Sequence, residues 1–194
     1  MHWRSYQKTF EAEGRPFPLE EYLRVAIGAP REQVIRAVLG DLPEAKMKHL
    51  MAEKERHVRE YLRDVGIATI PGALDFVRAL RSRGAKTAVA SASRTPDLIL
   101  GSVQALDLFD AIIGRGEVAR SKPHPDLYIH AAHVLKVPSS ECLVVEDSPV
   151  GIDAARAAGM NVLALTTTEG RENLSRASAV FSGFAEIPLD EWVA

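Results

Sequence analysis

The first third of the chain carries apolar residues at helical spacing. Trp3, Tyr6 and Phe10 share one face of the first segment, and a short segment between prolines follows it. The longer segment 42–66 repeats apolar residues at steps of three, four and seven and ends on a glycine. No strand-like alternation interrupts this pattern. We therefore predict a small α-helical domain over residues 1–66.

From residue 67 to residue 194 the pattern changes to short apolar strands separated by amphipathic helices. The expected strands are "KTAVASAS" (86–93), "DAIIG" (110–114), "ECLVVED" (141–147), "NVLALT" (161–166) and "ASAVF" (177–181). The expected helices are 72–83, a segment that starts at Thr95, 125–136 and 149–158. This alternation is typical of a parallel sheet with helices on both faces. The predicted fold class is α/β, with a Rossmann-like core domain over residues 67–194.

Polar residues follow several of the predicted strands. In open parallel sheets, ligands bind beyond the carboxyl ends of the strands. Ser91, Ser93 and Arg94 follow the first strand, and the second strand leads to Lys122, which precedes a proline-started helix. Hydroxyl groups and a fixed positive charge suit the oxygens of a phosphoryl group. The strand ends therefore indicate a phosphate-binding site.

The third predicted strand ends on two adjacent acids, Glu146 and Asp147. Their mutual repulsion disfavours the ionisation of both in a dry site unless a cation or a proton compensates. Mg²⁺ would compensate, and it takes about six oxygen ligands in an octahedron. Two carboxylates therefore supply only part of a magnesium site. We expect the remaining ligands to lie elsewhere.

Composition and charge exclude several classes of protein. The formal net charge of −2 provides no basic field for nucleic acid, and no run of about 18 apolar residues indicates a membrane span. The single cysteine, Cys142, precludes an internal disulfide, and the first residues lack the apolar core of a signal peptide. We expect a cytoplasmic monomer that binds a small molecule and binds neither nucleic acid nor membranes.

Three other functions were weighed against phosphoryl transfer. The segment 114–119, "GRGEVA", matches a dinucleotide-binding loop, but no long helix follows it before Pro123. His124, His130 and His133 lie close together in sequence, although their spacing matches no known zinc motif. A phosphorylation receiver domain has its acid pair on the first strand and its lysine on the last. Here the lysine precedes the acid pair, which disfavours that function.

The segments "VASASR", "RSKPHPDLY" and "LVVEDSPVGIDAARAAG", preceded by a helical cap, resemble the haloacid dehalogenase-like phosphatases. The resemblance is strongest to the beta-phosphoglucomutase and sugar-phosphatase branch, and it covers essentially the whole chain. It implies Mg²⁺-dependent phosphoryl transfer on a small phosphorylated metabolite, such as a sugar phosphate. It also implies that residues 1–66 form a cap that closes over the substrate. It fits a mutase and a phosphatase equally.

The resemblance also implies roles for individual residues. Ser91 corresponds to the serine that binds the transferring phosphoryl group, and Lys122 to the lysine that neutralises this group and the nucleophile. Asp147 corresponds to the direct Mg²⁺ ligand, and Glu146 to a residue that supports the metal site. Ser93 and Arg94 correspond to residues that contact a second phosphate in the mutase branch. In the cap, Arg31 corresponds to the arginine that binds the substrate phosphate, and Lys54 to a lysine near the sugar.

The chain departs from the family at its start. The family begins with an apolar strand that ends in a D-x-D-x-[TV] motif, whose first aspartate attacks phosphorus and whose second is the general acid/base. No such motif occurs in the 194 residues. Asp41, Asp64, Asp75 and Asp153 all lie in or beside predicted helices, so none of them replaces it.

In the family, this strand lies in the middle of the sheet, between the strand that ends at Asp147 and the one that ends at Ser91. Its loss would leave buried backbone groups unpaired, at about 1–3 kcal/mol each. We therefore expect the sequence to be a fragment or to have a mis-set start. The intact form would be active, and the 194-residue chain would lack turnover. The alternative is a non-catalytic phosphate-binding or regulatory pseudoenzyme.

Overall fold

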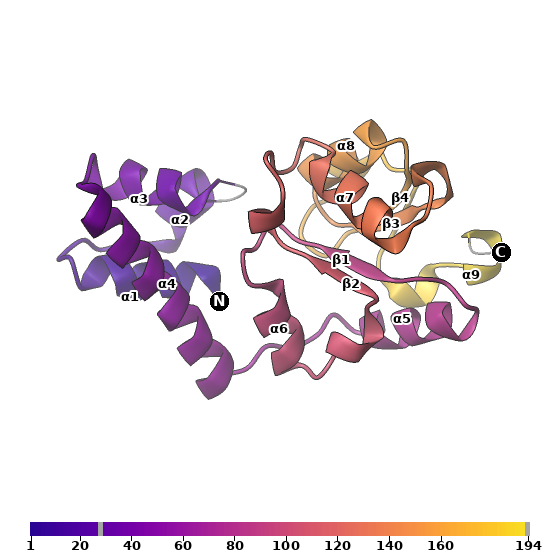
Figure 1. The fold of residues 1–194 in the computed structure, drawn as a ribbon, viewed down its shortest axis with the longest axis horizontal. Coiled ribbons are helices and arrows are strands. Elements are labelled where there is room, and N and C mark those ends of the chain that lie inside the picture. The colour runs from indigo at the N-terminus through magenta and orange to yellow at the C-terminus, as the bar shows by residue number, and fades with distance from the viewer. Residues whose placement is uncertain (27–28, 193–194) are drawn as a thin grey trace. The chain divides into compact units, whose positions relative to one another are not determined.

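The computed structural model describes residues 1–26 and 29–192 (Figure 1). The chain divides into two compact units, Met1–Ile67 and Ala68–Ala194, referred to below as the helical unit and the α/β unit. Among the described residues, no helix is both long and apolar enough to cross a membrane.

The helical unit contains α1 (His2–Glu11), α2 (Leu19–Val25), α3 (Arg31–Leu39) and α4 (Glu44–Asp64). Phe10, Phe17 and Leu50 are almost completely buried in its core, and the rings of Phe10 and Phe17 meet edge to face at 4.9 Å. The apolar spacing thus predicts α1 and α4 correctly. It does not single out α3, because only Val34 and Ile35 of that short helix are buried.

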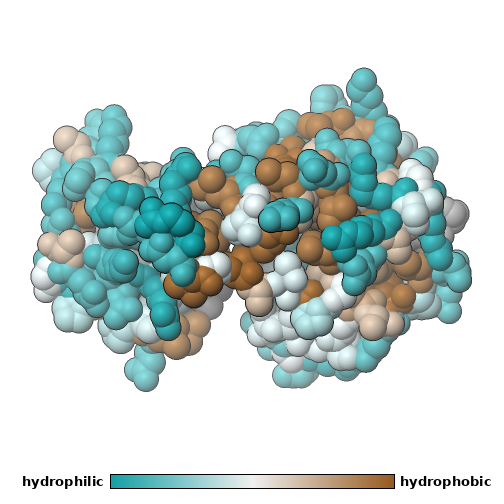
Figure 2. All heavy atoms as spheres, turned by 90° about the horizontal axis from the view of Figure 1, so that it is seen from below, coloured by the Kyte–Doolittle hydropathy of each residue, from teal (hydrophilic) through white to brown (hydrophobic). Residues whose placement is uncertain are grey.

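The surface of the helical unit is mainly polar. Figure 2 shows hydrophilic side chains over most of the face in view. On α4, Arg56 lies in ion-pair contact with Glu53 and Glu60, and Lys48 with Glu44. These pairs follow the spacing of three or four residues that brings side chains together on one face of a helix.

The α/β unit alternates strands and helices, as the sequence pattern predicts. Its strands are β1 (Ala88–Ala90), β2 (Ala111–Ile113), β3 (Leu143–Glu146), β4 (Asn161–Leu165) and β5 (Ala179–Phe181). Its α-helices are α5 (Ala73–Ser82), α6 (Pro96–Ser102), α7 (Asp126–Leu135), α8 (Pro149–Ala157) and α9 (Leu189–Trp192). Its short 3₁₀ turns are Leu106–Leu108, Arg115–Glu117, Ser139–Glu141, Arg171–Leu174 and Phe184–Glu186.

The strands form two parallel sheets rather than one continuous sheet. One contains β1 and β2, and the other has the order β3-β4-β5. Within the described ranges, no strand pairing joins the two sheets, so β1 and β3 are both edge strands. These are the two strands between which the family resemblance places a further strand.

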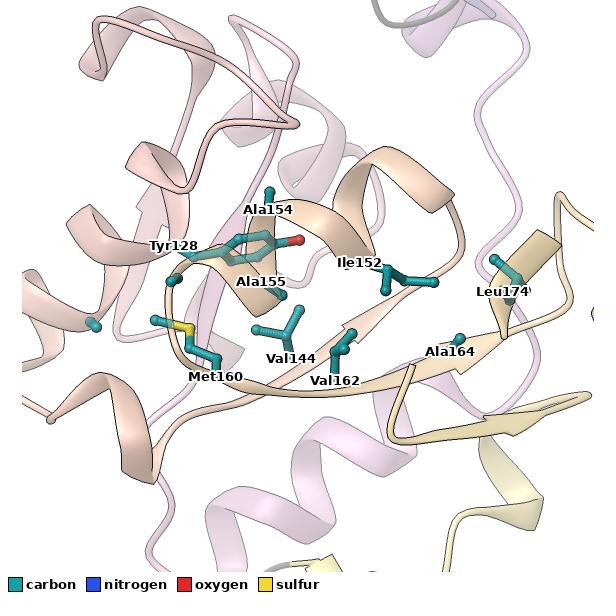
Figure 3. Packing of buried hydrophobic residues seen from close by; sticks show 11 residues of the cluster. Tyr128, Val144, Ile152, Ala154, Ala155, Met160, Val162, Ala164 and Leu174 are labelled. Carbon is teal, nitrogen blue, oxygen red and sulfur yellow. The ribbon is translucent and has the colours of Figure 1, made fainter. Parts of the chain in front are cut away.

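The main core of the α/β unit lies between α8 and the three-stranded sheet. Figure 3 shows Val144 of β3 and Val162 of β4 on the side of the strands that faces α8. Ala154 and Ala155 are fully buried on α8, and small side chains there allow the helix to approach the strands closely. Because α8 begins at Pro149, soon after β3 ends at Glu146, the start of this helix lies at the carboxyl end of that strand.

Candidate functional site

The carboxylate of Glu146, the last residue of β3, is the centre of a hydrogen-bond network. Its Oε1 accepts hydrogen bonds from Lys122 Nζ and from the Tyr128 hydroxyl, the latter at 2.5 Å. Its Oε2 accepts from the backbone N–H of Asp147 at 3.1 Å and from the Ser148 hydroxyl at 3.0 Å. Four donors satisfy about all the acceptor positions of a carboxylate.

The charge of Glu146 is stabilised although the side chain is only 8% exposed. Burial alone would raise the pKa of Glu146, but the Lys122 ammonium and the hydrogen bonds from Lys122 and Tyr128 hold it below its usual value. Burial and the neighbouring Glu146 charge raise the pKa of Tyr128, so its hydroxyl keeps the proton that it donates. The Lys122 ammonium also lies 4.9 Å from the centre of the Tyr128 ring.

The residue types that follow Glu146 are those that the start of α8 requires. Ser148 caps the helix, because its hydroxyl accepts a hydrogen bond from the Gly151 N–H at 3.2 Å, and Pro149 occupies the first turn. A Cβ atom on Gly151 would lie 2.1 Å from the Glu146 carboxyl carbon. Only glycine therefore allows the helix to start against this carboxylate.

Asp147 is half-buried and has a free carboxylate oxygen. Its Oδ2 accepts a hydrogen bond from the Thr167 hydroxyl at 3.2 Å, and its backbone carbonyl accepts one from the Thr168 hydroxyl at 2.6 Å. No donor in the described part of the chain reaches Oδ1. A carboxylate oxygen of this kind is the ligand type that Mg²⁺ prefers.

The residues present fit part of a magnesium site. Asp147 can supply one oxygen, whereas both oxygens of Glu146 are already used by hydrogen bonds. Among residues 1–26 and 29–192, no group of three or more His, Cys, Asp or Glu side chains could hold a metal ion. An octahedral site would therefore need further ligands, from water, substrate or other residues.

The loop after β1 holds the predicted phosphate-binding serine. The Ser91 N–H donates to Ile113 O of β2 at 2.9 Å, and the Ser91 hydroxyl accepts from the Ser93 N–H at 3.1 Å. The Ser93 hydroxyl accepts from the Thr95 N–H at 3.2 Å, and Arg94 is exposed. Among the described contacts, no hydrogen bond joins these side chains to the Lys122–Glu146 pair.

The helical unit brings together the two predicted cap residues. Arg31, the first residue of α3, donates to Met51 O at 3.0 Å and lies 3.6 Å from Glu55. Lys54 of α4 is only 4% exposed, and its Nζ lies 3.1 Å from His2 Nδ1 and 5.0 Å from the centre of the Tyr6 ring.

Lys54 and His2 both have strongly lowered pKa values. Burial, followed by the charge of Arg31, lowers the pKa of Lys54 from 10.5 to about 7. Burial, followed by the charge of Lys54, lowers the pKa of His2 from 6.5 to about 4. His2 is therefore neutral near pH 7 and accepts the hydrogen bond from Lys54.

Four residues of these networks were not predicted from the sequence: His2, Tyr128, Thr167 and Thr168. One signal for His2 was present: Lys54 interrupts the apolar face of α4 between Leu50 and Val58, and a buried ammonium needs a polar partner.

Two of the alternative functions lack structural support. His124 and His133 are exposed, and none of the three neighbouring histidines belongs to a metal-binding group within the described residues. The segment 114–119 forms a 3₁₀ turn followed by an extended residue, Val118, instead of opening a helix. A helix N-terminus is what a dinucleotide-binding loop needs.

Comparison with known proteins places the chain in one family. The family model described as haloacid dehalogenase-like hydrolase matches residues 4–159. Protein CbbY of Rhodobacter capsulatus is 32% identical over 180 residues, which cover 87% of this chain and 79% of that protein. Beta-phosphoglucomutase of Bacillus subtilis is 30% identical over 167 residues, which cover 82% of this chain and 73% of that protein.

A solved structure shows the same fold. The crystal structure of a CbbY variant from Rhodobacter sphaeroides in complex with xylulose-(1,5)-bisphosphate superimposes with a TM-score of 0.85 at 26% identity. The superposition covers 96% of this chain and 88% of that chain. Some matched proteins are longer, and this chain spans only 13%, 34% and 46% of three Arabidopsis thaliana relatives. The chain belongs to the haloacid dehalogenase-like hydrolases, in the beta-phosphoglucomutase and sugar-phosphatase branch.

Proposed function

We propose that the chain carries the phosphate-binding part and a share of the metal-binding part of a site for Mg²⁺-dependent phosphoryl transfer. The observation that carries this proposal is the arrangement at the end of β3. There Glu146 accepts a hydrogen bond from the ammonium of Lys122, and no donor among the described residues reaches Oδ1 of the next residue, Asp147. A fixed cation next to a free carboxylate can bind a phosphoryl group and its metal ion together.

Each residue at this end of the sheets has a distinct proposed role. Lys122 neutralises the oxygens of the transferring phosphoryl group, and the hydroxyl of Ser91 donates a hydrogen bond to them. Asp147 holds the metal through Oδ1, and Glu146 supports the site by orienting Lys122 and the start of α8. When bound, Mg²⁺ would stabilise the negative charge that develops on the phosphoryl oxygens.

We propose that the substrate is a small phosphorylated metabolite, such as a sugar phosphate. The names of the relatives, which include a beta-phosphoglucomutase, a hexitol phosphatase and a CbbY bound to a bisphosphate, support this class. In the helical unit, Arg31 would bind the substrate phosphate and Lys54 would lie near the sugar, whereas Ser93 and Arg94 would contact a second phosphate. A cap that excludes water favours a mutase, whereas a phosphatase must admit it.

The described residues provide no nucleophilic aspartate beside Lys122. Asp153 lies 2.6 Å from Arg176, and Asp75 lies 2.8 Å from Arg78 on the exposed face of α5. We therefore expect the 194-residue chain to bind phosphate without turning over a phosphate ester. An assay with p-nitrophenyl phosphate and Mg²⁺ tests this expectation, and clear metal-dependent turnover would contradict it.

Binding of inorganic phosphate in the presence of Mg²⁺, measured by calorimetry, tests the site itself. We expect Lys122→Ala to raise the dissociation constant about tenfold or more, because it removes a charged donor. Lys136→Ala is the matched control, since Lys136 is exposed at the opposite end of α7. Because Lys122→Ala leaves Glu146 unpaired, the double variant Lys122→Met with Glu146→Gln should be measured too. Unchanged phosphate binding in both variants would overturn the proposal.

A non-catalytic phosphate-binding protein is the second candidate, and the missing nucleophile is the observation that favours it. The DNA upstream of the Met1 codon separates the two candidates. In-frame codons for an apolar strand with a D-x-D-x-[TV] motif would support the enzyme. A stop codon directly upstream would support the binding protein.

A further inference from the structure

Tyr128, in the first turn of α7, contacts both members of the Lys122–Glu146 pair. Its hydroxyl donates a hydrogen bond to Glu146 Oε1, the same oxygen that accepts one from Lys122 Nζ. The face of its ring lies against the ammonium, with Nζ 4.9 Å from the ring centre. The side chain is buried in the main core with Ala154 and Ala155 of α8 (Figure 3). One buried residue thus meets the cation with its ring and the carboxylate with its hydroxyl.

The segment that carries Lys122 is closed onto the start of α7. The carboxylate of Asp126, the first residue of this helix, accepts hydrogen bonds from the Arg120 N–H at 3.2 Å and from the Arg120 guanidinium at 2.9 Å. One turn on, the Tyr128 N–H donates to Pro125 O at 3.0 Å. Lys122 lies inside the segment that Arg120 and Asp126 close, which keeps its backbone near the first turn of α7.

The ammonium of Lys122 is held from two sides. The Lys122 side chain is 13% exposed and the Glu146 side chain 8% exposed. A lysine side chain is long and flexible, so a hydrogen bond to one carboxylate oxygen leaves it free to adopt other rotamers. The attraction between the ammonium and the face of the Tyr128 ring favours the rotamer in which the two are in contact. Tyr128 therefore restricts the position of the charge more than Glu146 alone does.

We propose that Tyr128 is a positioning residue that holds the Lys122 ammonium ready to bind the phosphoryl group. This inference rests on the proposed function, in which Lys122 neutralises the phosphoryl oxygens. An ammonium has three N–H donors, and among the described residues Nζ makes one hydrogen bond, to Glu146. The remaining donors suit phosphate oxygens. Because the side chain is already ordered, phosphate binding is not weakened by a loss of side-chain freedom.

Calorimetric titration of the full 194-residue chain with inorganic phosphate, under the conditions used for Lys122→Ala, tests the proposal. We expect Tyr128→Phe, which keeps the ring and loses the hydroxyl, to raise the dissociation constant about threefold. Tyr128→Leu loses both groups and should raise it about tenfold. Tyr22→Phe is the matched control, because the described residues include no hydrogen-bond partner for the Tyr22 hydroxyl.

A second comparison separates positioning from stability, because Tyr128→Leu also removes packing from the core. Ile187→Ala truncates a buried side chain of the α/β unit that belongs to a different core cluster from Tyr128. It should lower the stability of the unit and leave the dissociation constant for phosphate unchanged. If Ile187→Ala weakens phosphate binding as much as Tyr128→Leu does, the effect of Tyr128 is one of stability and the proposal is wrong.

Nuclear magnetic resonance of the lysine ammonium groups gives a readout that a merely structural role would not change. An aromatic ring shields protons above its face, so the Nζ protons of Lys122 should resonate upfield of those of the exposed lysines. Lys122→Met assigns the signal in a sample with ¹⁵N-labelled lysine. We expect the upfield shift to persist in Tyr128→Phe and to disappear in Tyr128→Leu. An unchanged shift in Tyr128→Leu would overturn the proposal.

Lys122→Ala separates this inference from the function on which it rests. If Lys122→Ala weakens phosphate binding while both Tyr128 variants bind phosphate as the unaltered chain does, the inference is wrong and the proposed role of Lys122 stands. If phosphate binding is unchanged without Lys122, or is absent in the unaltered chain, the proposed function and the inference both fail.

Discussion

Two lysines with little exposure to solvent, one in each unit, differ in the group that accepts a hydrogen bond from their ammonium. Lys122 and Lys54 lie at almost the same distance from a tyrosine ring, 4.9 Å from Tyr128 and 5.0 Å from Tyr6. Lys122 is paired with the carboxylate of Glu146, whereas the hydrogen-bond partner of Lys54 is the neutral ring of His2.

The difference has a direct physical consequence. A carboxylate compensates the charge of the ammonium beside it, while a neutral imidazole offers only a lone pair and leaves burial to act against the charge. The pKa of Lys54 therefore falls to about 7. In the proposed function, Lys122 binds phosphate through an ammonium group that Glu146 holds in place, and Lys54 becomes fully charged only when an anion binds nearby.

We expect the largest effect on stability from substitution of Lys122, the lysine that is paired with a carboxylate. Lys122→Ala leaves Glu146 buried without its cation, which should lower the free energy of unfolding of the α/β unit by about 3 kcal/mol. Urea unfolding followed by the fluorescence of Trp192 in a Trp3→Phe background measures it. Adding Glu146→Gln should recover part of the loss, and a loss below about 1 kcal/mol would show that the pair is not coupled.

For Lys54, which has no carboxylate as its hydrogen-bond partner, we expect substitution to increase stability. Lys54→Met removes a buried charge and keeps an apolar chain of similar length, so the helical unit should become about 2 kcal/mol more stable at pH 6. The fluorescence of Trp3 in a Trp192→Phe background reports this unit. Lys48→Met, at an exposed position of the same helix, should change stability by less than about 0.5 kcal/mol. Destabilisation by Lys54→Met would mean that its charge is compensated.

The two units should respond to pH in different windows. For Lys54, the pKa is about 7 when folded and 10.5 as the ordinary value, so the unfolded state binds more protons between these values. The stability of the helical unit therefore rises with pH from about 7 to 10, by at most about 1.4 kcal/mol per pH unit.

Other charged or titratable groups face Lys54 and contribute to this profile. They are the Met1 amino group, His2, Arg31 and Glu55. His2 adds a rise of the same sign between pH 4 and 6.5, because its pKa is lowered as well. Lys54→Met should remove the alkaline rise and keep the acidic one. An unchanged alkaline rise in this variant would assign the effect to another group.

In the α/β unit, the contribution of Glu146 to stability changes at lower pH. Its pKa is lowered by folding, so its contribution to stability is fully present above about pH 4.5, the ordinary value. That contribution is lost as the pH falls through the folded value. Glu146→Gln with Lys122→Met should therefore make this unit less sensitive to acid. Equal acid sensitivity of the double variant and the unaltered chain would contradict this account.

The smallest effect concerns the two tyrosines. Tyr128→Phe keeps the ring beside Lys122 but removes one of four hydrogen bonds to Glu146, which should cost about 1 kcal/mol. Tyr6→Phe should change stability by less than about 0.5 kcal/mol, because the described residues include no hydrogen-bond partner for the Tyr6 hydroxyl. If urea unfolding shows the same change in the free energy of unfolding for both substitutions, the hydrogen bond from the Tyr128 hydroxyl to Glu146 does not contribute to stability.

Much of the fold could be predicted from local sequence. Apolar spacing placed α1, α4 and α8 within a few residues, because a helix that buries one face repeats its apolar residues with the helical period. Strand lengths were overestimated: 86–93 was expected, and the strand spans Ala88–Ala90. Pairing depends on the adjacent strand, which a local pattern does not contain.

Some residues of the candidate site could likewise be predicted from the sequence, and others could not. Lys122, Glu146 and Asp147 could be found from sequence because each lies at the end of a predicted strand or in the segment after one. His2 and Tyr128 could not, because they act on residues 52 and 18 positions away in the chain. Thr167 and Asp147 are separated by 20 positions, and only the parallel register of β3 and β4 brings them together.

The sequence by itself determined the α/β class, the family and the residue types at the strand ends, since these depend on periodicity and on motifs a few residues long. The tertiary structure decided which charged groups are paired and with what partner. It paired Glu146 with Lys122, left Oδ1 of Asp147 without a donor among the described residues, and gave Lys54 a neutral partner. The physical reason is that charge stabilisation depends on distances of a few ångströms between groups that are far apart in the chain.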